Sequence, residues 1–249
     1  MFFPRSDCLF VGTRKLYEHL QPVFHLHQIK MGRDALFDRL RSNQLLIRKT
    51  RRFHITTDSH HYFYTSPNRV KDLEIKHAEQ VFVNDITYIK TDNGHAYLSL
   101  VTDAYSKKIM GWSLDENMKV SMVKEALKMA HKNSMYNRSS VIHHSDRGIQ
   151  YCCPDYTAFA KGLNFEMSTT QNSDPYENAI AERINGILKY EFGLRKVLPS
   201  VEVARKIVKQ AVEIYNNERL HWSLDLKTPQ YVHQQYNKQK YKRYARMAA

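Results

Sequence analysis

Cysteine is scarce in this chain of 249 residues, which holds only three: Cys8, Cys152 and Cys153. Two of them are adjacent, and no C-x-x-C pair is present. Small disulfide-stabilised proteins carry a larger even set, and cysteine-based zinc sites place their ligands in spaced pairs. The sequence therefore supports neither a disulfide framework nor a cysteine-based zinc site.

Long apolar runs are also missing from the sequence. No stretch approaches the roughly 18 to 20 apolar residues that a membrane-spanning helix needs. The opening MFFPRSDCLF lacks the long apolar region of a signal peptide. We therefore expect a soluble cytoplasmic protein that does not associate with a membrane through a spanning segment.

Acidic residues are few relative to basic ones. The chain has 25 Asp and Glu against 38 Lys and Arg, which gives a formal net charge of +13. A polyanion is the natural partner of such a chain, either nucleic acid or an anionic membrane surface. Tryptophan is rare as well, with two residues. A glycosidase is therefore disfavoured, because few rings can stack on sugars and a neutral polysaccharide gains nothing from the positive charge.

The N-terminal residues 1–46 contain two short amphipathic patterns, GTRKLYEHLQ and GRDALFDRLRSNQLL. Leu16 and Leu20 share one face of the first, and Leu36 and Leu40 share one face of the second. Two such helices fit a partial helix-turn-helix unit. They fit equally well a small helical hairpin that only packs, and the sequence leaves both interpretations open.

A basic linker, residues 47–78, follows the helical segment. Its charged run IRKTRRFH and the polar stretch after it predict a segment that buries no core. The basic residues that we expect to contact a phosphate backbone are Arg48, Lys49, Arg51 and Arg52. Residues 233–249 form a second basic segment, a solvated tail that could also touch phosphate groups.

From residue 79 to residue 232 the pattern changes to that of a packed α/β domain. Five short runs rich in β-branched and aromatic residues predict strands: VFVNDITYIK, HAYLSLVTDAY, KKIMGWSL, SSVIHH and NFEMSTT. Helical periodicity predicts helices after the third, fourth and fifth strands. A meander followed by alternating helices and strands predicts a mixed five-stranded sheet flanked by helices. This order resembles that of ribonuclease-H-like domains.

Three carboxylates stand out in this domain. Asp85 lies inside the first predicted strand, where an ionised carboxylate is costly unless it is paired, hydrogen-bonded or bound to metal. Asp146 directly follows the fourth strand, which neighbours the first in a ribonuclease-H-like sheet. Glu182 shares a polar helix face with Asn185 and Lys189. All three could therefore look into one cleft.

Convergent carboxylates have a specific use with a polyanion. Their oxygens hold hard cations such as Mg²⁺, and two ions about 3.5 to 4 Å apart can clamp the attacking and leaving oxygens of a phosphodiester displacement. Gly148, two residues after Asp146, is expected to let the backbone turn away beside such a ligand. The segment TTQNSDPYENA before Glu182 is polar and long, so a structure without DNA could show Glu182 displaced.

The spacing and local motifs resemble a known family. Thirty-five residues separate Asp146 from Glu182, as in the D-D-35-E signature of retroviral integrases and related transposases. The motifs VNDITYI, HHSDRGIQY, STTQNSDPYENAIAERINGILKYE and YNNERLHWSLDLKTP look like those of integrase-type (DDE) transposases of bacterial insertion sequences. The resemblance is to the IS-three family, specifically to its second-reading-frame product, and it runs from about Gly12 to about Val232.

The resemblance implies roles for individual residues. Asp85 would bridge two Mg²⁺ or Mn²⁺ ions, Asp146 would hold one of them, and Glu182 the other. Lys189, two helical turns after Glu182, resembles the lysine that related integrases place against DNA, although a solvated surface lysine is the simpler alternative. His144 matches a family histidine, for which we expect a hydrogen bond that supports the site or the fold and not direct ligation.

The resemblance also implies partners and a location. It predicts a DNA polynucleotidyl transferase that cleaves insertion-sequence terminal repeats and joins them to target DNA. It further predicts a homo-oligomer on DNA, a possible first-reading-frame protein or fusion as partner, and a bacterial, nucleoid-associated location in the cytoplasm. The alternative is a catalytically silent or truncated DNA-binding regulator of transposition. We interpret Asn217, Arg219 and His221 as packing and hydrogen-bonding residues.

Overall fold

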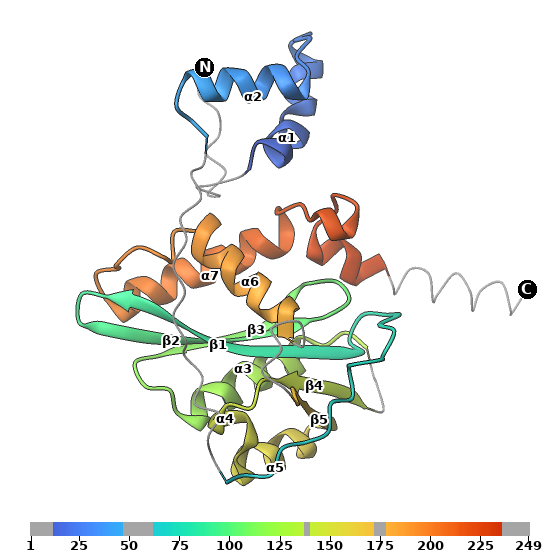
Figure 1. Cartoon of the computed structure of the whole chain (residues 1–249), viewed down its shortest axis with the longest axis vertical. Helices are drawn as coiled ribbons and strands as arrows, with labels where there is room; N and C mark the ends of the chain where they lie inside the picture. Colours follow the sequence, from blue (N-terminus) through green and yellow to red (C-terminus); the bar gives the residue numbers. More distant parts are fainter. Residues whose placement is uncertain (1–11, 47–61, 137–139, 172–177, 236–249) are drawn as a thin grey trace, which may run out of the picture.

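The computed structural model describes residues 12–46, 62–136, 140–171 and 178–235. Within them, five strands form one mixed sheet, as predicted (Figure 1). The strands are β1 (Val81–Thr91), β2 (Gly94–Asp103), β3 (Ile109–Asp115), β4 (Val141–Ser145) and β5 (Phe165–Thr169). Their order across the sheet is β3-β2-β1-β4-β5. The first three strands pair antiparallel, whereas β1 with β4 and β4 with β5 pair parallel.

Helices cover both faces of the sheet (Figure 1). On one face lie α3 (Val120–Asn133), α4 (Ile149–Cys152) and α5 (Pro154–Gly162), and on the other lie α6 (Ala179–Glu191) and α7 (Val201–Asn217). The sequence did not predict α4, because four residues carry too little periodicity to distinguish a helix from a turn. The mixed sheet flanked by helices is therefore confirmed, with one short helix added.

Alternation along the strands gives each face its own core. In β2, Leu98 and Leu100 pack with residues of α6 and α7, whereas Val101 packs on the opposite face with residues of α3 and α5. These three side chains are at most 2% exposed. On α6, Ile184 and Leu188 join the first of these cores. Their burial seats α6 against β1 and β2 and so fixes which strand the polar face of α6 can reach.

Helix α3 approaches the sheet closely at Gly111 of β3. A Cβ atom at this position would lie 2.1 Å from the carbonyl oxygen of Ala126 and 2.6 Å from the backbone nitrogen of Ala130. Both atoms belong to the backbone of α3, so they cannot move aside as a flexible side chain would. Glycine is therefore required for the seating of α3 on β3.

The described part of the predicted linker, residues 62–78, does not match the expectation that it buries no core. Val70, Leu73 and Ile75 pack against a buried cluster that includes Val81 and Val83 of β1. The expectation was wrong here because these apolar residues are scattered among charged ones. Their spacing follows neither the helical nor the strand periodicity. The basic residues Arg48, Lys49, Arg51 and Arg52, like the tail from residue 236, lie outside the described residues.

The end of α7 is anchored by an asparagine that the sequence reading passed over. The side chain of Asn216 accepts a hydrogen bond from the backbone N–H of Ile109 and donates one to its carbonyl oxygen, at 2.9 and 3.0 Å. The neighbouring Asn217, which we expected to pack, is exposed and donates only to Glu213 of its own helix. Arg219 and His221 are buried, as expected.

The N-terminal segment contains α1 (Thr13–Leu26) and α2 (Arg33–Ser42), which contact each other. Only Leu36 is buried among the residues of these two helices. An ion pair of 3.6 Å between Lys15 Nζ and Glu191 connects α1 to the end of α6. No helix in the described ranges is long and apolar enough to cross a membrane.

Candidate active site

The pairing of two parallel strands places Asp85 beside Asp146. In the register of β1 with β4, Asn84 lies opposite Ser145. The residue after Asn84 is Asp85, which is still inside β1, and the residue after Ser145 is Asp146, which directly follows β4. Adjacent strands lie about 4.8 Å apart, so the two carboxylates share one end of the paired region. This is the convergence that the sequence predicted for these two residues.

The electrostatics of Asp85 agree with this proximity. The pKa of its carboxyl is raised from 3.8 to about 7, mainly by burial and, to a smaller extent, by the nearby carboxylates of Asp146 and Glu182. Two hydrogen bonds act against the shift: the backbone N–H of Ile86 donates to Oδ1 at 2.9 Å, and Asn185 Nδ2 donates to Oδ2 at 2.6 Å. The charged form of Asp85 thus lacks a cationic partner strong enough to compensate its burial.

Asp146 is held by the turn that follows it. The backbone N–H of Gly148 donates to Asp146 Oδ1 at 3.0 Å. Gly148 has φ −62° and ψ 140°, an ordinary extended conformation, so our expectation that glycine supplies conformational freedom here was wrong. The restriction is one of space, because a Cβ atom at Gly148 would lie 3.0 Å from Asp146 Oδ1 and 3.5 Å from Gln150 Oε1.

Glu182 lies in the first turn of α6 and is exposed. Partial burial raises its pKa, and the Asp146 carboxylate adds to the shift, so Glu182 faces the same region as the two aspartates. The described residues nevertheless contain no group of three or more His, Cys, Asp or Glu side chains that could together hold a metal ion. The structure therefore brings Asp85 and Asp146 together at one end of the β1–β4 pairing, with Glu182 facing the same region from α6. The expected displacement of Glu182 in the DNA-free protein stays a prediction.

Lys189 lies two turns further along α6. Its Nζ is 4.3 Å from the centre of the Tyr88 ring on β1, a cation–π contact. Burial lowers the pKa of Lys189, and the nearby Asp85 opposes this shift. The lysine therefore faces the strand that carries Asp85, although its contact with DNA stays a prediction.

His144 is buried in β4, two residues before Asp146. Its Nδ1 is 2.9 Å from Ser168 Oγ on β5, and the same hydroxyl accepts a hydrogen bond from the backbone N–H of Arg69. These contacts join β4, β5 and the segment before β1 that contains Arg69. They are compatible with the expected supporting hydrogen bond, and a role for His144 beside Asp146 stays a prediction.

Asn185 is the residue that the sequence reading undervalued. It was placed on the polar face of α6 but given no role, whereas the structure shows it 5% exposed and bonded to Asp85. Its Oδ1 is buried and has no hydrogen-bond partner among the described residues. Its position three residues after Glu182, on the same helix face, was the available signal.

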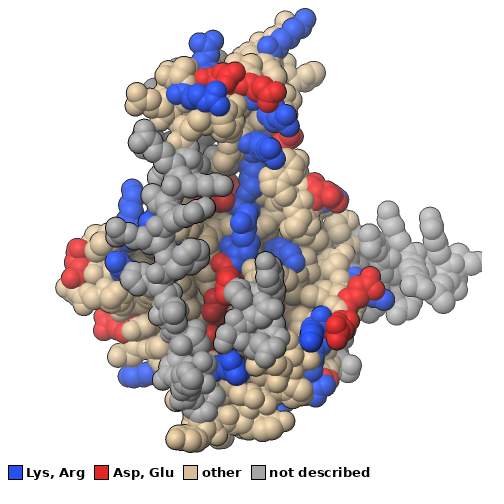
Figure 2. All heavy atoms as spheres, viewed as in Figure 1, with Lys and Arg blue, Asp and Glu red and all other residues tan. Residues whose placement is uncertain are grey.

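A groove of about 580 Å³ runs along α6 next to these residues and is lined by Glu182, Arg183, Gly186, Tyr190 and Glu191, with Ala179 and Ile187. Lys and Arg side chains gather along the centre of the face shown in Figure 2, below the N-terminal helices. The lining of the groove itself places one basic side chain, Arg183, beside the carboxylates of Glu182 and Glu191.

Comparison with known proteins agrees with this geometry. Residues 76–175 and residues 163–229 each match a family described as Integrase core domain. The chain is 31% identical over 228 residues to the insertion element IS600 uncharacterized 31 kDa protein of Shigella sonnei, which covers 91% of this chain and 82% of that protein. It is 33% identical over 201 residues to transposase InsF for insertion sequence IS3fB of Escherichia coli (strain K12), covering 78% of this chain and 68% of InsF.

A solved structure shares the fold. The HTLV-2 integrase catalytic core domain in complex with magnesium, in its dimeric form, is similar with a TM-score of 0.50 and 17% sequence identity. The match covers 63% of this chain and 97% of that one. It supports the ribonuclease-H-like architecture, whereas the assignment of individual site residues depends on the local geometry described above.

Proposed function

This chain belongs to the integrase-core family of insertion-sequence transposases, and we propose from that premise that it cleaves insertion-sequence ends and joins them to other DNA. The observation that supports this proposal most directly is the pair formed by Asp85 and Asp146 at the end of two paired parallel strands. Glu182 on α6 supplies the third carboxylate. We propose that these three are the catalytic residues.

The donor set fits a divalent cation. Asp85 and Asp146 offer carboxylate oxygens side by side, and the raised pKa of Asp85 reports negative charge without sufficient compensation. Oxygen ligands of this kind suit Mg²⁺ or Mn²⁺, which would stabilise the charge that develops on the attacking and leaving oxygens of a phosphodiester. We propose two ions per site, which Asp85, Asp146 and Glu182 together would hold when DNA is bound.

The residues of the chain have distinct tasks in this proposal. Asn185 holds one oxygen of Asp85 and so fixes the direction in which the other can coordinate. Lys189, half-buried against Tyr88, presents its ammonium group to a phosphate near the scissile bond. Both effects are positional: they align the carboxylates and the DNA strand, and alignment of reacting groups lowers the barrier of a displacement.

The proposed reaction has two displacements and no covalent protein intermediate. In the first, a water oxygen bonds to the phosphorus at the element end, and the 3′ oxygen of the broken bond leaves as a hydroxyl. In the second, that hydroxyl oxygen bonds to a phosphorus of target DNA, and the 3′ oxygen of the target strand leaves. Neither step needs a protein nucleophile, because water and then the DNA end supply the attacking oxygen.

DNA is the proposed partner, both as terminal repeats and as target. We further propose a homo-oligomer on DNA, with a first-reading-frame protein or fusion contributing end recognition, at chromosomal DNA in the bacterial cytoplasm. Arg48, Lys49, Arg51 and Arg52 are proposed to neutralise backbone phosphates. A silent DNA-binding regulator is not favoured, because a chain without chemistry gains nothing from the costly pair of adjacent carboxylates at Asp85 and Asp146.

The experiment that tests this function is a strand-transfer assay with DNA carrying the element's ends. We expect joining that requires Mg²⁺ or Mn²⁺, that EDTA abolishes, and that Asp85→Asn, Asp146→Asn and Glu182→Gln each lose. DNA binding by the variants should persist and should weaken steeply with salt, since several phosphates are neutralised. Full joining activity in all three variants would show that the assigned site is wrong.

A further inference from the structure

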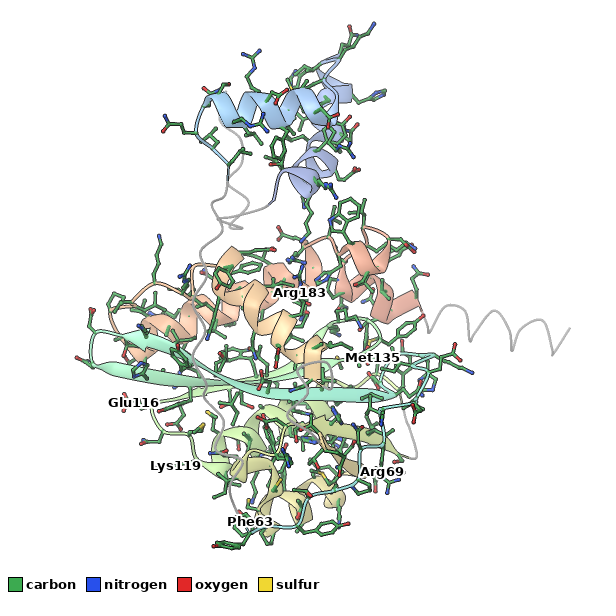
Figure 3. All side chains as sticks on the ribbon, in the orientation of Figure 1. Phe63, Arg69, Glu116, Lys119, Met135 and Arg183 are labelled. Carbon is green, nitrogen blue, oxygen red and sulfur yellow. The ribbon has the colours of Figure 1, made fainter. Side chains whose placement is uncertain are left out.

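A second cavity, of about 310 Å³, lies on the other side of Arg183 from the groove that holds Glu182. It is formed where α1, α6 and the segment after α7 meet. Its basic and polar lining residues are Lys15, Lys107, Arg183, Arg219, His221 and Ser223. Arg183, labelled in Figure 3, lies on α6 on the side where α1 approaches the core. The cavity therefore draws its charge from four separate parts of the chain: α1, the turn between β2 and β3, α6 and the segment after α7.

The cavity has more basic side chains than carboxylates that pair with them. Glu191 binds Arg219 through two hydrogen bonds of 2.6 Å and also pairs with Lys15. One carboxylate thus serves two cations. Arg183 is exposed and makes no ion pair with any described residue. Neighbouring cations that share one carboxylate repel each other, so an anion bound in the cavity would stabilise this arrangement.

His221 gives an independent sign of a missing ligand. The residue is 6% exposed, lines the cavity, and its Nε2 has no hydrogen-bond partner among the described residues. The pKa of His221 is lowered to about 3, mainly by burial and also by the positive charges of Arg219 and Lys15. A neutral imidazole can still donate one N–H, and an anion in the cavity would accept it.

The first turn of α6 adds backbone donors. Ala179 and Ile180 line the cavity, and the N-cap residue of α6, Asn178, makes no side-chain cap hydrogen bond. The N–H groups at a helix start carry partial positive charge and bind phosphate readily. The cavity therefore combines side-chain cations, an unpartnered buried imidazole and a helix N-terminus.

An indole marks the rim of the same cavity. Trp222 is 54% exposed and lines the opening, where its ring can accept a flat apolar partner. Nucleobases stack on exposed aromatic side chains of proteins that bind single strands. Ala179, Arg183 and Ile187 line both this cavity and the groove of Glu182, so a DNA strand crossing α6 would pass from one to the other.

We propose that this cavity binds one phosphate of a DNA strand between Lys15 and Arg183, with the adjoining unpaired base stacked on Trp222. The proposal rests on the proposed function, since it names where a strand leaving the carboxylate groove would be held. It also gives α1 a task, because Lys15 closes the cavity from the N-terminal segment. By binding an unpaired nucleotide next to the groove of Glu182, the cavity would hold a DNA end whose strands have separated.

The test is a titration of the full chain, in EDTA, with a 5′-phosphorylated thymidine tetranucleotide. Tryptophan fluorescence reports stacking, because the chain has two tryptophans and Trp112 is partly buried in the core. We expect quenching that Trp222→Phe greatly reduces. In an anisotropy assay with labelled tetranucleotide, Trp222→Ala should weaken binding about 10-fold. Absence of quenching in the wild-type chain would overturn the proposal.

Two charge variants test the phosphate. Arg183→Gln and Lys15→Gln should each weaken binding about fivefold and reduce the slope of log affinity against log salt by about 0.7. Arg183 is exposed, so its variant keeps the fold even if loss of Lys15 loosens α1. The matched control is Lys128→Gln, which removes the same charge from an exposed site on α3, across the sheet. Equal weakening by this control would overturn the proposal.

Two further arms identify the occupant. A tetranucleotide with an uncharged methylphosphonate backbone should bind at least about 10-fold more weakly than the charged one. Inorganic phosphate should compete only at far higher concentration than the tetranucleotide. If it competes equally well, the cavity is a simple anion site and the proposed nucleotide is wrong. Because these measurements contain no divalent ion, they can fail while metal-dependent joining succeeds, and joining can fail while they succeed.

Discussion

The carboxylates on the sheet and the carboxylate on the helix are prepared to different degrees. Asp85 and Asp146 are brought together by the hydrogen-bonded pairing of β1 with β4, which does not depend on any ligand. Glu182 lies in the first turn of α6, is exposed, and makes no three-residue metal group with them in the described part of the chain. Under the proposed function, the strand pairing would preassemble two ligands at an energetic cost, and the third would join when substrate is bound.

The largest expected effect is on strand transfer, and comparing it with metal binding distinguishes the aspartates from Glu182. In the DNA-free protein, Mg²⁺ or Mn²⁺ should raise the melting temperature of the wild type and of Glu182→Gln, but not of Asp85→Asn or Asp146→Asn. All three variants should lose at least about 1000-fold in strand transfer, since several kcal/mol of charge stabilisation disappears. Thermal melting with and without metal provides the measurement. If Glu182→Gln loses the metal-induced rise in melting temperature as completely as the aspartate variants, Glu182 already binds metal without DNA. The proposed difference between Glu182 and the two aspartates is then wrong.

The cost of preassembly should appear as a pH dependence of stability. The folded protein keeps a proton on Asp85 up to about pH 7, whereas the unfolded chain releases it near 3.8, so the contribution of Asp85 to stability falls as pH rises through this window. Above about pH 7, Asp85→Asn should therefore be more stable than the metal-free wild type by about 1 to 3 kcal/mol. Urea unfolding at several pH values measures the difference.

The matched control for this measurement is Glu182→Gln, whose side chain is exposed and should change stability little at any of these pH values. A wild-type chain and an Asp85→Asn variant with parallel stability curves from pH 4 to pH 8 would contradict the predicted cost.

The smallest expected effect concerns the turn that holds Asp146. Gly148→Ala adds a Cβ atom 3.0 Å from Asp146 Oδ1, so the carboxylate must shift by a few tenths of an ångström. Such a displacement should lower strand transfer about 3- to 10-fold, because misplacement of a reacting group by 1 Å costs about 100-fold. Gly162→Ala, at a position with no atom within 4 Å of the added Cβ, serves as control. Equal activity of the two variants would show that Asp146 tolerates the shift.

The fold was largely predictable because its signals are local. Runs rich in β-branched and aromatic residues located all five strands, and the order of strands and helices indicated a mixed sheet. The burial of Val70, Leu73 and Ile75 was missed because it depends on contact with β1, which no local pattern encodes. The prediction that Asn217 packs, where the structure shows Asn216 in that role, failed for a similar reason. Moving one residue along a helix turns the side chain by about 100°, and only tertiary contacts show which of the two faces the core.

The candidate site was predictable in part for the same reason. Asp85 and Asp146 could be placed because each sits at a defined point of a predicted strand. The distance of Glu182 from them depends on how α6 is seated by Ile184 and Leu188, which is a matter of tertiary packing. The bond from Asn185 to Asp85 joins residues 100 positions apart, so its polar helix face indicated only that some partner was required.

The amide of Asn216 has a consequence for self-association. β3 is the border strand of the sheet, and an open border invites a strand from another molecule to add by backbone pairing. By bonding both the N–H and the carbonyl of Ile109, the side chain imitates a neighbouring peptide group and occupies that border where β3 starts. Addition of a strand from a second molecule is thereby blocked at the start of β3.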